Sequence, residues 1–364
     1  MSDSEPHTLH LAPGYEIPRI IVGTWQFSEE HHVDAFERED ALDTLGILAD
    51  AGLTAFDCAD IYTGVEQLLG EFFRSRQEEL ANGPPIRVHT KFVPDRDALP
   101  HISKTHTEAI IDRSLRRLGV ERLDLVQFAW WDYAVPRYVE TALWLQELTD
   151  AGKIRFIGAT NFDVPRLREI VDAGVSVATH QVQYSLLDHR PETTMVAFCR
   201  ERRIHLLCYG TLAGGFLSDR WLGAPEPATH LPNRSLTKYK LIIEEFGGWD
   251  AFQKLLRIAN DIATKHGVSI GDVATRYVLQ QPQVGAAIVG ARSSAHVQEN
   301  LRTLALRLDP EDISMLHGLA APNRPAGDVY TLERRPASAH AAIMRYNLNR
   351  AAPDNLDPPT KHQS

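Results

Sequence analysis

The chain has 364 residues, of which 43% are hydrophobic and 24% are charged, and its formal net charge at pH 7 is −10. This acidic balance argues against nucleic acid as a main partner, because phosphate binding needs a clustered basic face. No apolar run is long enough to cross a bilayer, so we expect no contact with a membrane interior. The length suits two domains or one elaborated α/β barrel.

The N-terminus and the cysteines indicate the cytoplasm. The first residues, MSDSEPHTLHLAPG, are polar and lack the basic-then-apolar pattern of a secretory signal. The chain has three cysteines, Cys58, Cys199 and Cys208, which are too few and too scattered for a disulfide framework. We therefore expect a reducing compartment.

Short apolar runs alternate with longer helical patterns, which predicts parallel strands joined by helices. The predicted strands are 19–24, 55–57, 87–91, 123–128, 156–159, 178–182, 205–209 and 286–289. Helices are predicted at 40–51, 107–118, 141–151 and 164–173, each followed directly by a glycine. Strands that are apolar throughout are buried on both faces, so we predict a single (β/α)₈ barrel over residues 18–320.

Three segments lie outside the strand–helix rhythm. Residues 1–17 form an N-terminal arm, and the proline-containing stretch 218–250 is interpreted as a long loop after the seventh strand. Residues 321–364 form a C-terminal extension rich in proline, and we expect its last residues to be disordered. Long loops of this kind are often functional, so we expect 218–250 and 321–350 to cover the barrel mouth and determine specificity.

Polar residues follow most of the predicted strands, at the barrel end where such folds place their chemistry. From Gly23-Thr24-Trp25 to Asn300, six motifs occur in register with successive strand ends. In this order they resemble the aldo-keto reductases over roughly residues 18–305. The resemblance implies hydride transfer between a nicotinamide cofactor and a small carbonyl or alcohol substrate. NADPH is the expected cofactor, and NADH is possible.

Three residues on adjacent strands form the predicted catalytic group: Asp57, Tyr62 and Lys91. A tyrosine hydroxyl is a poor proton shuttle at neutral pH, and a nearby ammonium lowers its pKa. The resemblance implies that Tyr62 is the general acid, that Lys91 tunes it and that Asp57 anchors Lys91. The alternative is a purely structural ion pair between Asp57 and Lys91, with Tyr62 at the rim.

One position departs from the family's pattern. The family places a histidine at the end of the fourth strand, in a pattern like Gln-x-His-Trp-Pro, whereas residues 126–132 here read VQFAWWD. Ala129 therefore stands at the histidine's position. Loss of one positioned hydrogen-bond donor can cost ~10²–10³ in rate. The substitution leaves open a slow enzyme, a replacement donor, or a protein that has kept the cofactor site and lost turnover.

Two side-chain amides and one aromatic ring form the nicotinamide end of the predicted cofactor site. Asn161 and Gln181 offer the donor and the acceptor that a carboxamide needs, and Thr160 can add a hydroxyl. The ring of Tyr209 can stack on the nicotinamide, although core packing alone would also explain this residue. The resemblance adds three residues from the strand ends to this group: Thr24, Trp25 and Asp57.

Small residues and the start of a helix form the phosphate and adenosine end of the predicted cofactor site. Leu212 and Gly214 belong to a stretch that suits a pyrophosphate close to the backbone, and Gly290 precedes a helix start that can bind an anion. Arg292 is the candidate for a 2′-phosphate, although it and His296 could also lie on a solvated helix face. Glu299 and Asn300 resemble the family's adenine contacts.

Several tryptophans, Trp25, Trp130 and Trp131, are the predicted walls of an aromatic substrate pocket, although part of this group could serve packing alone. No metal motif such as HExxH is present, so we predict no metal. Two other functions are weighed: a nicotinamide-binding regulatory or redox-sensing subunit, and a barrel aldolase or isomerase that uses Lys91 as a Schiff base. The sequence does not indicate an oligomeric state.

Overall fold

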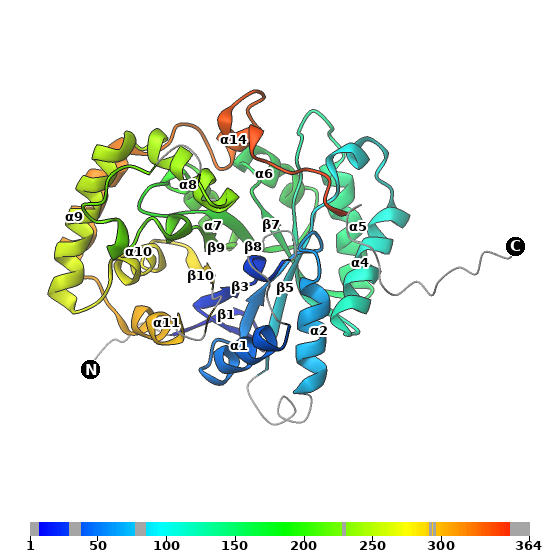
Figure 1. Cartoon of the computed structure of the whole chain (residues 1–364). Coiled ribbons are helices and arrows are strands. Elements are labelled where there is room, and N and C mark those ends of the chain that lie inside the picture. Colours follow the sequence, from blue (N-terminus) through cyan, green and yellow to red (C-terminus); the bar gives the residue numbers. More distant parts are fainter. Residues whose placement is uncertain are drawn as a thin grey trace, which may run out of the picture.

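A closed barrel of parallel strands forms the centre of the protein (Figure 1). The computed structural model describes residues 7–28, 38–76, 85–227, 231–290, 293 and 296–349. Arg292 and the predicted disordered end lie outside the described residues. The barrel strands are β3 (Ile20–Gly23), β4 (Ala55–Asp57), β5 (Arg87–Phe92), β6 (Leu123–Phe128), β7 (Ile154–Thr160), β8 (Val177–Gln183), β9 (His205–Tyr209) and β10 (Val284–Gly290). The order closes as β10 pairs with β3, which confirms the predicted (β/α)₈ barrel.

Helices surround these strands (Figure 1). The described helices longer than one turn are α1 (Arg38–Asp50), α2 (Val65–Ser75), α4 (Lys104–Leu118), α5 (Tyr138–Asp150), α6 (Val164–Asp172), α7 (Met195–Arg202), α8 (Arg234–Glu245), α9 (Gly248–His266), α10 (Ile270–Leu279), α11 (His296–Ala305) and α12 (Pro310–Ala320). The predicted glycine stops act as expected: Gly119 ends α4 with φ 68° and donates its N–H to Leu115 and Arg116. None of the described helices has the length and apolarity to cross a bilayer.

An antiparallel hairpin, formed mostly by residues of the predicted N-terminal arm, precedes the barrel. It consists of β1 (Thr8–Ala12) and β2 (Tyr15–Pro18). Tyr15 and Ile17 are buried against inward-facing barrel residues such as Leu125. A side chain at Gly285 would collide with Leu9, because its Cβ would lie 2.6 Å from the Leu9 Cδ2 atom. The hairpin therefore plugs the amino-terminal end of the barrel and leaves the carboxyl-terminal end for ligands.

The segment 218–250 was predicted as a long loop, and this prediction is wrong in its second half. Asn233 caps α8 by accepting a hydrogen bond from the backbone N–H of Leu236. The helix then buries Tyr239, Ile242 and Ile243. It lies against the turn after β9 because Gly210 and Gly214 have no side chains. A Cβ atom on Gly210 would lie 2.3 Å from the Tyr239 hydroxyl oxygen.

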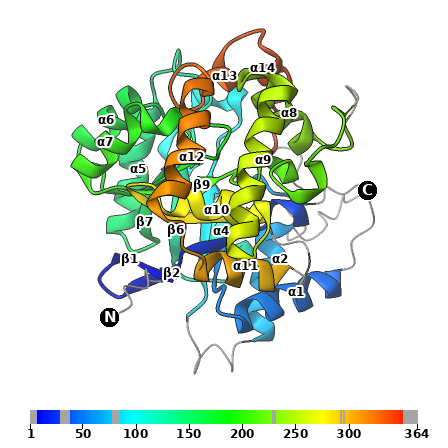
Figure 2. The same cartoon turned by 90° about the vertical axis from the view of Figure 1, so that its left-hand side faces the viewer.

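The described part of the C-terminal extension, up to residue 349, runs across the barrel mouth. It contains the short helices α13 (Thr331–Arg334) and α14 (Ala339–Ala342) and crosses the end of the barrel (Figures 1 and 2). On the far side, the Asn349 Nδ2 atom donates to the carbonyl oxygen of Val93 at 2.8 Å. The backbone N–H of Arg96 donates to Tyr346 at 2.9 Å. These bonds attach the far end of the described extension to the segment that follows β5.

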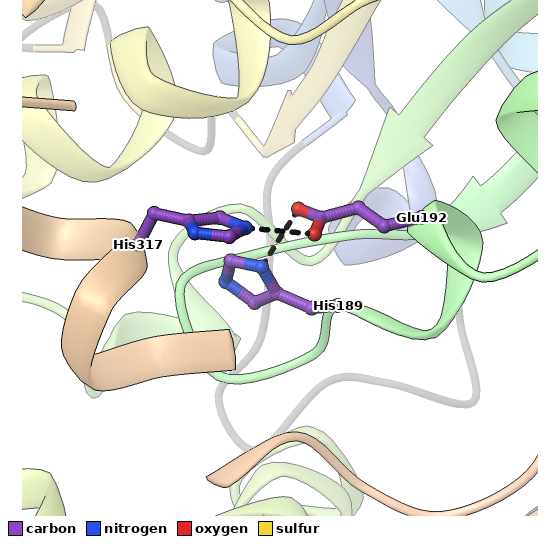
Figure 3. Close-up of side chains that lie close together, drawn as sticks. All are labelled: His189, Glu192 and His317. Atoms are coloured by element: carbon purple, nitrogen blue, oxygen red, sulfur yellow. Dashed lines mark hydrogen bonds and ion pairs between the residues drawn. The ribbon is translucent and has the colours of Figure 1, made fainter. Parts of the chain in front are cut away.

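A single carboxylate joins α12 to the barrel (Figure 3). Glu192 lies in the 3₁₀ turn after β8, and its oxygens accept hydrogen bonds from His189 Nδ1 at 2.7 Å and from the Tyr184 hydroxyl at 2.6 Å. His317 of α12 donates from Nε2 at 3.2 Å. Burial alone would raise the pKa of Glu192. The hydrogen bonds from His189, Tyr184 and His317 outweigh this effect of burial and lower the pKa of Glu192 to about 2. Both carboxylate oxygens are satisfied by these donors without an ion.

We expect Glu192→Gln to lower the free energy of unfolding at pH 7 by about 1–3 kcal/mol, because the amide cannot accept from all three donors as a charge does. The folded-state pKa of Glu192, about 2, lies below its ordinary value, so the stabilisation is complete above about pH 4.5 and is lost as the pH falls toward 2. Urea unfolding should therefore show a smaller difference at pH 4 than at pH 7. The exposed Glu201→Gln variant is the control, and equal midpoints for Glu192→Gln and wild type at pH 7 would contradict the assignment.

Candidate active site

A pocket of about 570 Å³ lies at the carboxyl ends of the strands, between α8 and the C-terminal extension. This volume suits a small-molecule or cofactor site. The predicted site residues that line it are Thr24, Trp25, Asp57, Tyr62, Lys91, Trp130, Trp131, Thr160, Asn161, Gln181, Tyr209, Leu212, Gly214, Gly290 and His296, and Ala129 lines it as well. Glu299 and Asn300 are not among its lining residues, and Arg292 lies outside the described part of the chain.

Asp57 is the centre of a buried hydrogen-bond network beneath the pocket. Its Oδ2 atom lies 2.5 Å from the Lys91 Nζ atom. Its Oδ1 atom accepts from Gln127 Nε2 at 2.8 Å and from Gln181 Nε2 at 2.7 Å. These partners come from β5, β6 and β8, so one carboxylate connects four barrel strands. Gln127 was not predicted as a site residue.

Lys91 is held as a charged ammonium. Its Nζ atom also donates to the carbonyl oxygen of Cys58 at 2.9 Å and lies 5.1 Å from the centre of the Tyr62 ring. Burial favours the neutral amine, but the attraction of Asp57 and Tyr62 outweighs it and raises the pKa of Lys91 above its ordinary value. A Schiff base needs a neutral amine, so this environment disfavours the aldolase hypothesis.

Tyr62 lies beside this ammonium, but its acidity changes in the direction opposite to our expectation. Burial raises the pKa of Tyr62, Lys91 lowers it, and Asp57 raises it again. The result is a pKa above the ordinary value, because the cost of burying a phenolate exceeds the attraction of one ammonium that is already paired with Asp57. The prediction that the pKa of Tyr62 lies below its ordinary value is therefore wrong. The Tyr62 hydroxyl is a phenol at neutral pH, with a proton to donate.

Asn161 and Gln181 present opposite hydrogen-bonding groups at the next strand ends. The Gln181 Nε2 atom donates to Asp57 and, at 2.8 Å, to the Gln127 Oε1 atom, so the Gln181 carbonyl oxygen remains as an acceptor. Asn161 Oδ1 accepts from the Tyr209 hydroxyl at 2.9 Å, which leaves the Asn161 amide nitrogen as a donor. The orientation of Gln181 follows from chemistry, since a carboxylate accepts only from the nitrogen. Together the two amides complement a carboxamide.

The turn after β9 and the start of α8 form the next wall. Gly215 has φ 100° and open space around its Cβ position, so its backbone is accessible. A side chain on Gly214 would collide with α8, because its Cβ atom would lie 2.8 Å from the Tyr239 Cδ2 atom. The predicted small residues therefore also serve the packing of α8. Sequence analysis missed the pocket-lining polar residues of α8 because the helix itself was missed; they are Arg234, Ser235 and Lys238.

Lys238 adds a charge beside Tyr209. Its Nζ atom lies 4.9 Å from the centre of the Tyr209 ring and 4.0 Å from Glu333 of α13. Burial lowers the pKa of Lys238, and Glu333 only partly offsets this effect. Arg190, buried behind them, bonds to both Glu333 and Asp188. These residues form one buried charge network that links α8 and α13 to the barrel.

The helix α11 borders the far end of the pocket. His296 lines the pocket, and its Nδ1 atom lies 2.9 Å from Glu299. Asn300 is buried, and its Nδ2 atom has no hydrogen-bond partner within the described part of the chain. A Cβ atom at Gly290 would lie 2.1 Å from the Gln26 side chain. Glycine at position 290 is therefore needed for the close approach of Gln26 at this end of the pocket.

The three tryptophans of the predicted aromatic wall all line the pocket, but they differ in how far they are buried. Trp25 stacks on Tyr62 with ring centres 6.4 Å apart, and Trp131 contacts Tyr346 of the extension edge-to-face at 5.2 Å. Trp130, in contrast, is 1% exposed and donates its indole N–H to the backbone of residues 132 and 135. Trp130 thus serves mainly the core.

The site departs from the expected pattern at the end of β6. Ala129 is buried, has no polar side chain and donates its backbone N–H to Phe92. The carbonyl oxygen of the next residue, Trp130, accepts a hydrogen bond from Arg334 of α13 at 2.9 Å. Arg334 was not predicted, because it lies far along the chain in a segment without a recognisable motif.

Comparison with known proteins agrees with this architecture. The model of the Aldo/keto reductase family matches residues 19–321. Aldo-keto reductase YhdN of Bacillus subtilis (strain 168) is 26% identical over 309 residues, which cover 82% of this chain and 88% of the relative. The NADH-specific methylglyoxal reductase of Escherichia coli (strain K12) is 24% identical over 84% of this chain and 95% of the relative. The structure of a glycerol dehydrogenase from Gluconobacter oxydans is similar with a TM-score of 0.72 and 25% identity, covering 88% and 97% of the two chains.

The chain therefore belongs to the aldo/keto reductase family of oxidoreductases. The predicted family is confirmed.

We expect Asp57→Asn to lower the free energy of unfolding by about 3–5 kcal/mol, because it leaves the buried Lys91 ammonium without its counter-charge. Chemical denaturation at pH 7 measures this loss. The matched control is Asp112→Asn, which removes the half-exposed partner of Lys153; it should cost less than about 1 kcal/mol. Losses of equal size in the two variants would show that the Asp57 pair does not organise the site.

Proposed function

We propose that the protein is an NADPH-dependent reductase of small carbonyl compounds, with Tyr62 as the general acid. The observation that carries this proposal is the position of the Tyr62 ring beside the Lys91 ammonium, which Asp57 fixes, in one wall of the pocket. The amides of Asn161 and Gln181, which complement a carboxamide, line the same pocket.

In this proposal each residue has a separate task. A bound reduced nicotinamide would supply the hydride for the carbonyl carbon. Tyr62 gives its proton to the carbonyl oxygen, so the product is an alcohol and the tyrosine is left as a phenolate. The Lys91 ammonium stabilises that phenolate, and Asp57 keeps Lys91 charged and in place. Water restores the proton of Tyr62 between turnovers.

The walls of the pocket support a dinucleotide as the bound cofactor. Asn161 and Gln181 would hold the carboxamide, and Tyr209 would pack on the ring. The accessible backbone of Gly215 and the first turn of α8 suit a pyrophosphate. Thr24, Trp25, Thr160, Leu212, Gly214, Gly290, His296, Glu299 and Asn300 complete the proposed cofactor site. Arg292 is proposed to favour NADPH over NADH; one relative is named as NADH-specific, so NADH is the alternative.

A regulatory or redox-sensing subunit is the second candidate, and Ala129 is the observation that favours it. Without a donor at the end of β6, a bound carbonyl loses one group that would orient and polarise it. Such a protein would bind the nicotinamide cofactor and turn over no carbonyl. The two functions share the cofactor and differ in turnover.

The Tyr62→Phe variant should lower kcat for carbonyl reduction by ~10²–10⁴-fold, because it removes the proton donor and leaves the cofactor contacts in place. Turnover is followed by the absorbance of NADPH with a panel of aldehydes and ketones, and cofactor binding by fluorescence titration. Tyr346→Phe, which removes another hydroxyl near the mouth, is the control. Normal turnover by Tyr62→Phe would refute the general-acid role. Cofactor binding with no turnover by the wild type would favour the regulatory subunit.

The pH dependence of reduction should reflect the raised pKa of Tyr62. The phenol is the active acid form, so activity is complete below this pKa and is lost only as the pH rises through it. We expect kcat to stay nearly constant from about pH 6 to about pH 9. Burial also lowers the pKa values of His89 and His180 to about 4, so these two histidines stay neutral over that range. A fall in kcat centred near pH 7 would contradict the assignment.

A further inference from the structure

We propose that the substrate carries an anionic group, a carboxylate or a phosphate, and that Arg334 of α13 binds it. This proposal rests on the proposed reductase function and names the class of substrate that the site selects. Its starting point is the charge of the pocket. Asp57 is the one acidic residue in the described lining, whereas five lining residues are basic: Lys91, Arg234, Lys238, Arg334 and Arg345.

Arg334 differs from Lys91 and Lys238, the lysines that line the pocket, because each of these lies beside a carboxylate and Arg334 does not. Its Nη1 atom donates to the carbonyl oxygen of Asn161 at 2.7 Å, and its Nη2 atom donates to that of Trp130 at 2.9 Å. Its guanidinium lies 4.2 Å from the ring centre of Tyr133 and 5.1 Å from that of Tyr330. All four partners are uncharged, and none of the ion pairs found in the described residues includes Arg334.

The neighbouring acids are already engaged elsewhere. Glu333, the residue before Arg334, pairs with Arg190 at 3.2 Å. The charge of Arg334 lowers the pKa of Asp163 slightly against the effect of burial, but the Asp163 Oδ2 atom forms its ion pair with Arg166 Nη1, at 3.4 Å. A half-buried guanidinium without a counter-ion costs free energy unless a ligand supplies the charge. Arg334 thus offers a fixed positive charge to whatever fills the pocket.

Its position assigns this charge to the substrate and not to the cofactor phosphates. Arg234 and Lys238 lie on α8, beside the turn after β9 where we place the pyrophosphate. Arg334 lies on the extension and bonds to the backbone of Asn161 and Trp130. Asn161 belongs to the proposed carboxamide site, and Trp130 follows Ala129. The absence of a side chain beyond Cβ at Ala129 leaves room on that side. A planar guanidinium matches a carboxylate or phosphate with two parallel hydrogen bonds.

The experiment compares substrates that differ in charge and little else. The first pair is 4-formylbenzoate and its neutral methyl ester, and the second is glyceraldehyde 3-phosphate and glyceraldehyde. The readout is the ratio of kcat/KM for the anionic member to that for the neutral member. This ratio cancels any general damage from the loss of the Arg334 bonds to the backbone. The two pairs distinguish a carboxylate from a phosphate.

Three variants test the role of the residue. Arg334→Met should lower the ratio roughly 10- to 100-fold for the preferred anion, the effect expected for loss of one charged hydrogen-bond partner. Arg334→Lys should retain part of the preference, because it keeps the charge and loses the planar geometry. Arg335→Met is the matched control: it removes the charge of the exposed adjacent residue, which does not line the pocket. It should leave the ratio unchanged within about 3-fold.

A binding measurement separates failure of this proposal from failure of the reductase function. Isothermal titration calorimetry of 4-(hydroxymethyl)benzoate and its methyl ester, with and without NADP⁺, reports the anion preference without turnover. Tighter binding of the carboxylate that is lost in Arg334→Met supports the proposal even if no carbonyl is reduced. The proposal is overturned, and the reductase function left standing, if neither the carboxylate nor the phosphate is preferred to its neutral partner, or if the preference is unchanged in Arg334→Met.

Discussion

The ion pair between Asp57 and Lys91 is the interaction on which the rest of the site depends. Two opposite charges are buried at the centre of the barrel, and their separation from water is tolerable because each has additional hydrogen bonds. Gln127 and Gln181 bond to the Asp57 oxygen that Lys91 does not use. The same contacts fix the orientation of the Gln181 amide, which lines the pocket. One carboxylate therefore positions both the ammonium beside Tyr62, the proposed proton donor, and the amide at the proposed nicotinamide site.

The mouth of the barrel is completed by segments from distant parts of the chain. The helix α8 closes over the turn after β9, and the C-terminal extension spans from the β8–β9 side to β5. A buried network of Asp188, Arg190, Glu333 and Lys238 attaches both segments to the barrel. The amino-terminal hairpin closes the opposite end and contributes no pocket residue. Stability and ligand contact are thus divided between the two ends of the barrel.

The sequence was sufficient for the barrel, and most of the site residues predicted from it line the pocket. Each strand is a short apolar run, each predicted helix ends at a glycine, and polar residues follow the strands in a recognisable order. Arg334 escaped because its partners lie far away in the chain, one of them 173 residues off, and no local pattern marks such contacts. The direction of the Tyr62 pKa shift was not predicted from the sequence for another reason. It depends on the balance of burial against one paired charge, which spacing does not reveal. α8 was obscured by the prolines before Asn233, although its apolar spacing is helical.

The short helix α13 places an anchoring residue and a pocket residue side by side. Glu333 secures the extension through Arg190, and Arg334, the next residue, lines the pocket. A substitution that shifts the backbone of α13 would therefore affect both the attachment of the extension and the pocket. Changes of the pocket during evolution would meet less of this constraint at Ile343 and Leu348, which line the pocket and take part in none of the buried ion pairs described above.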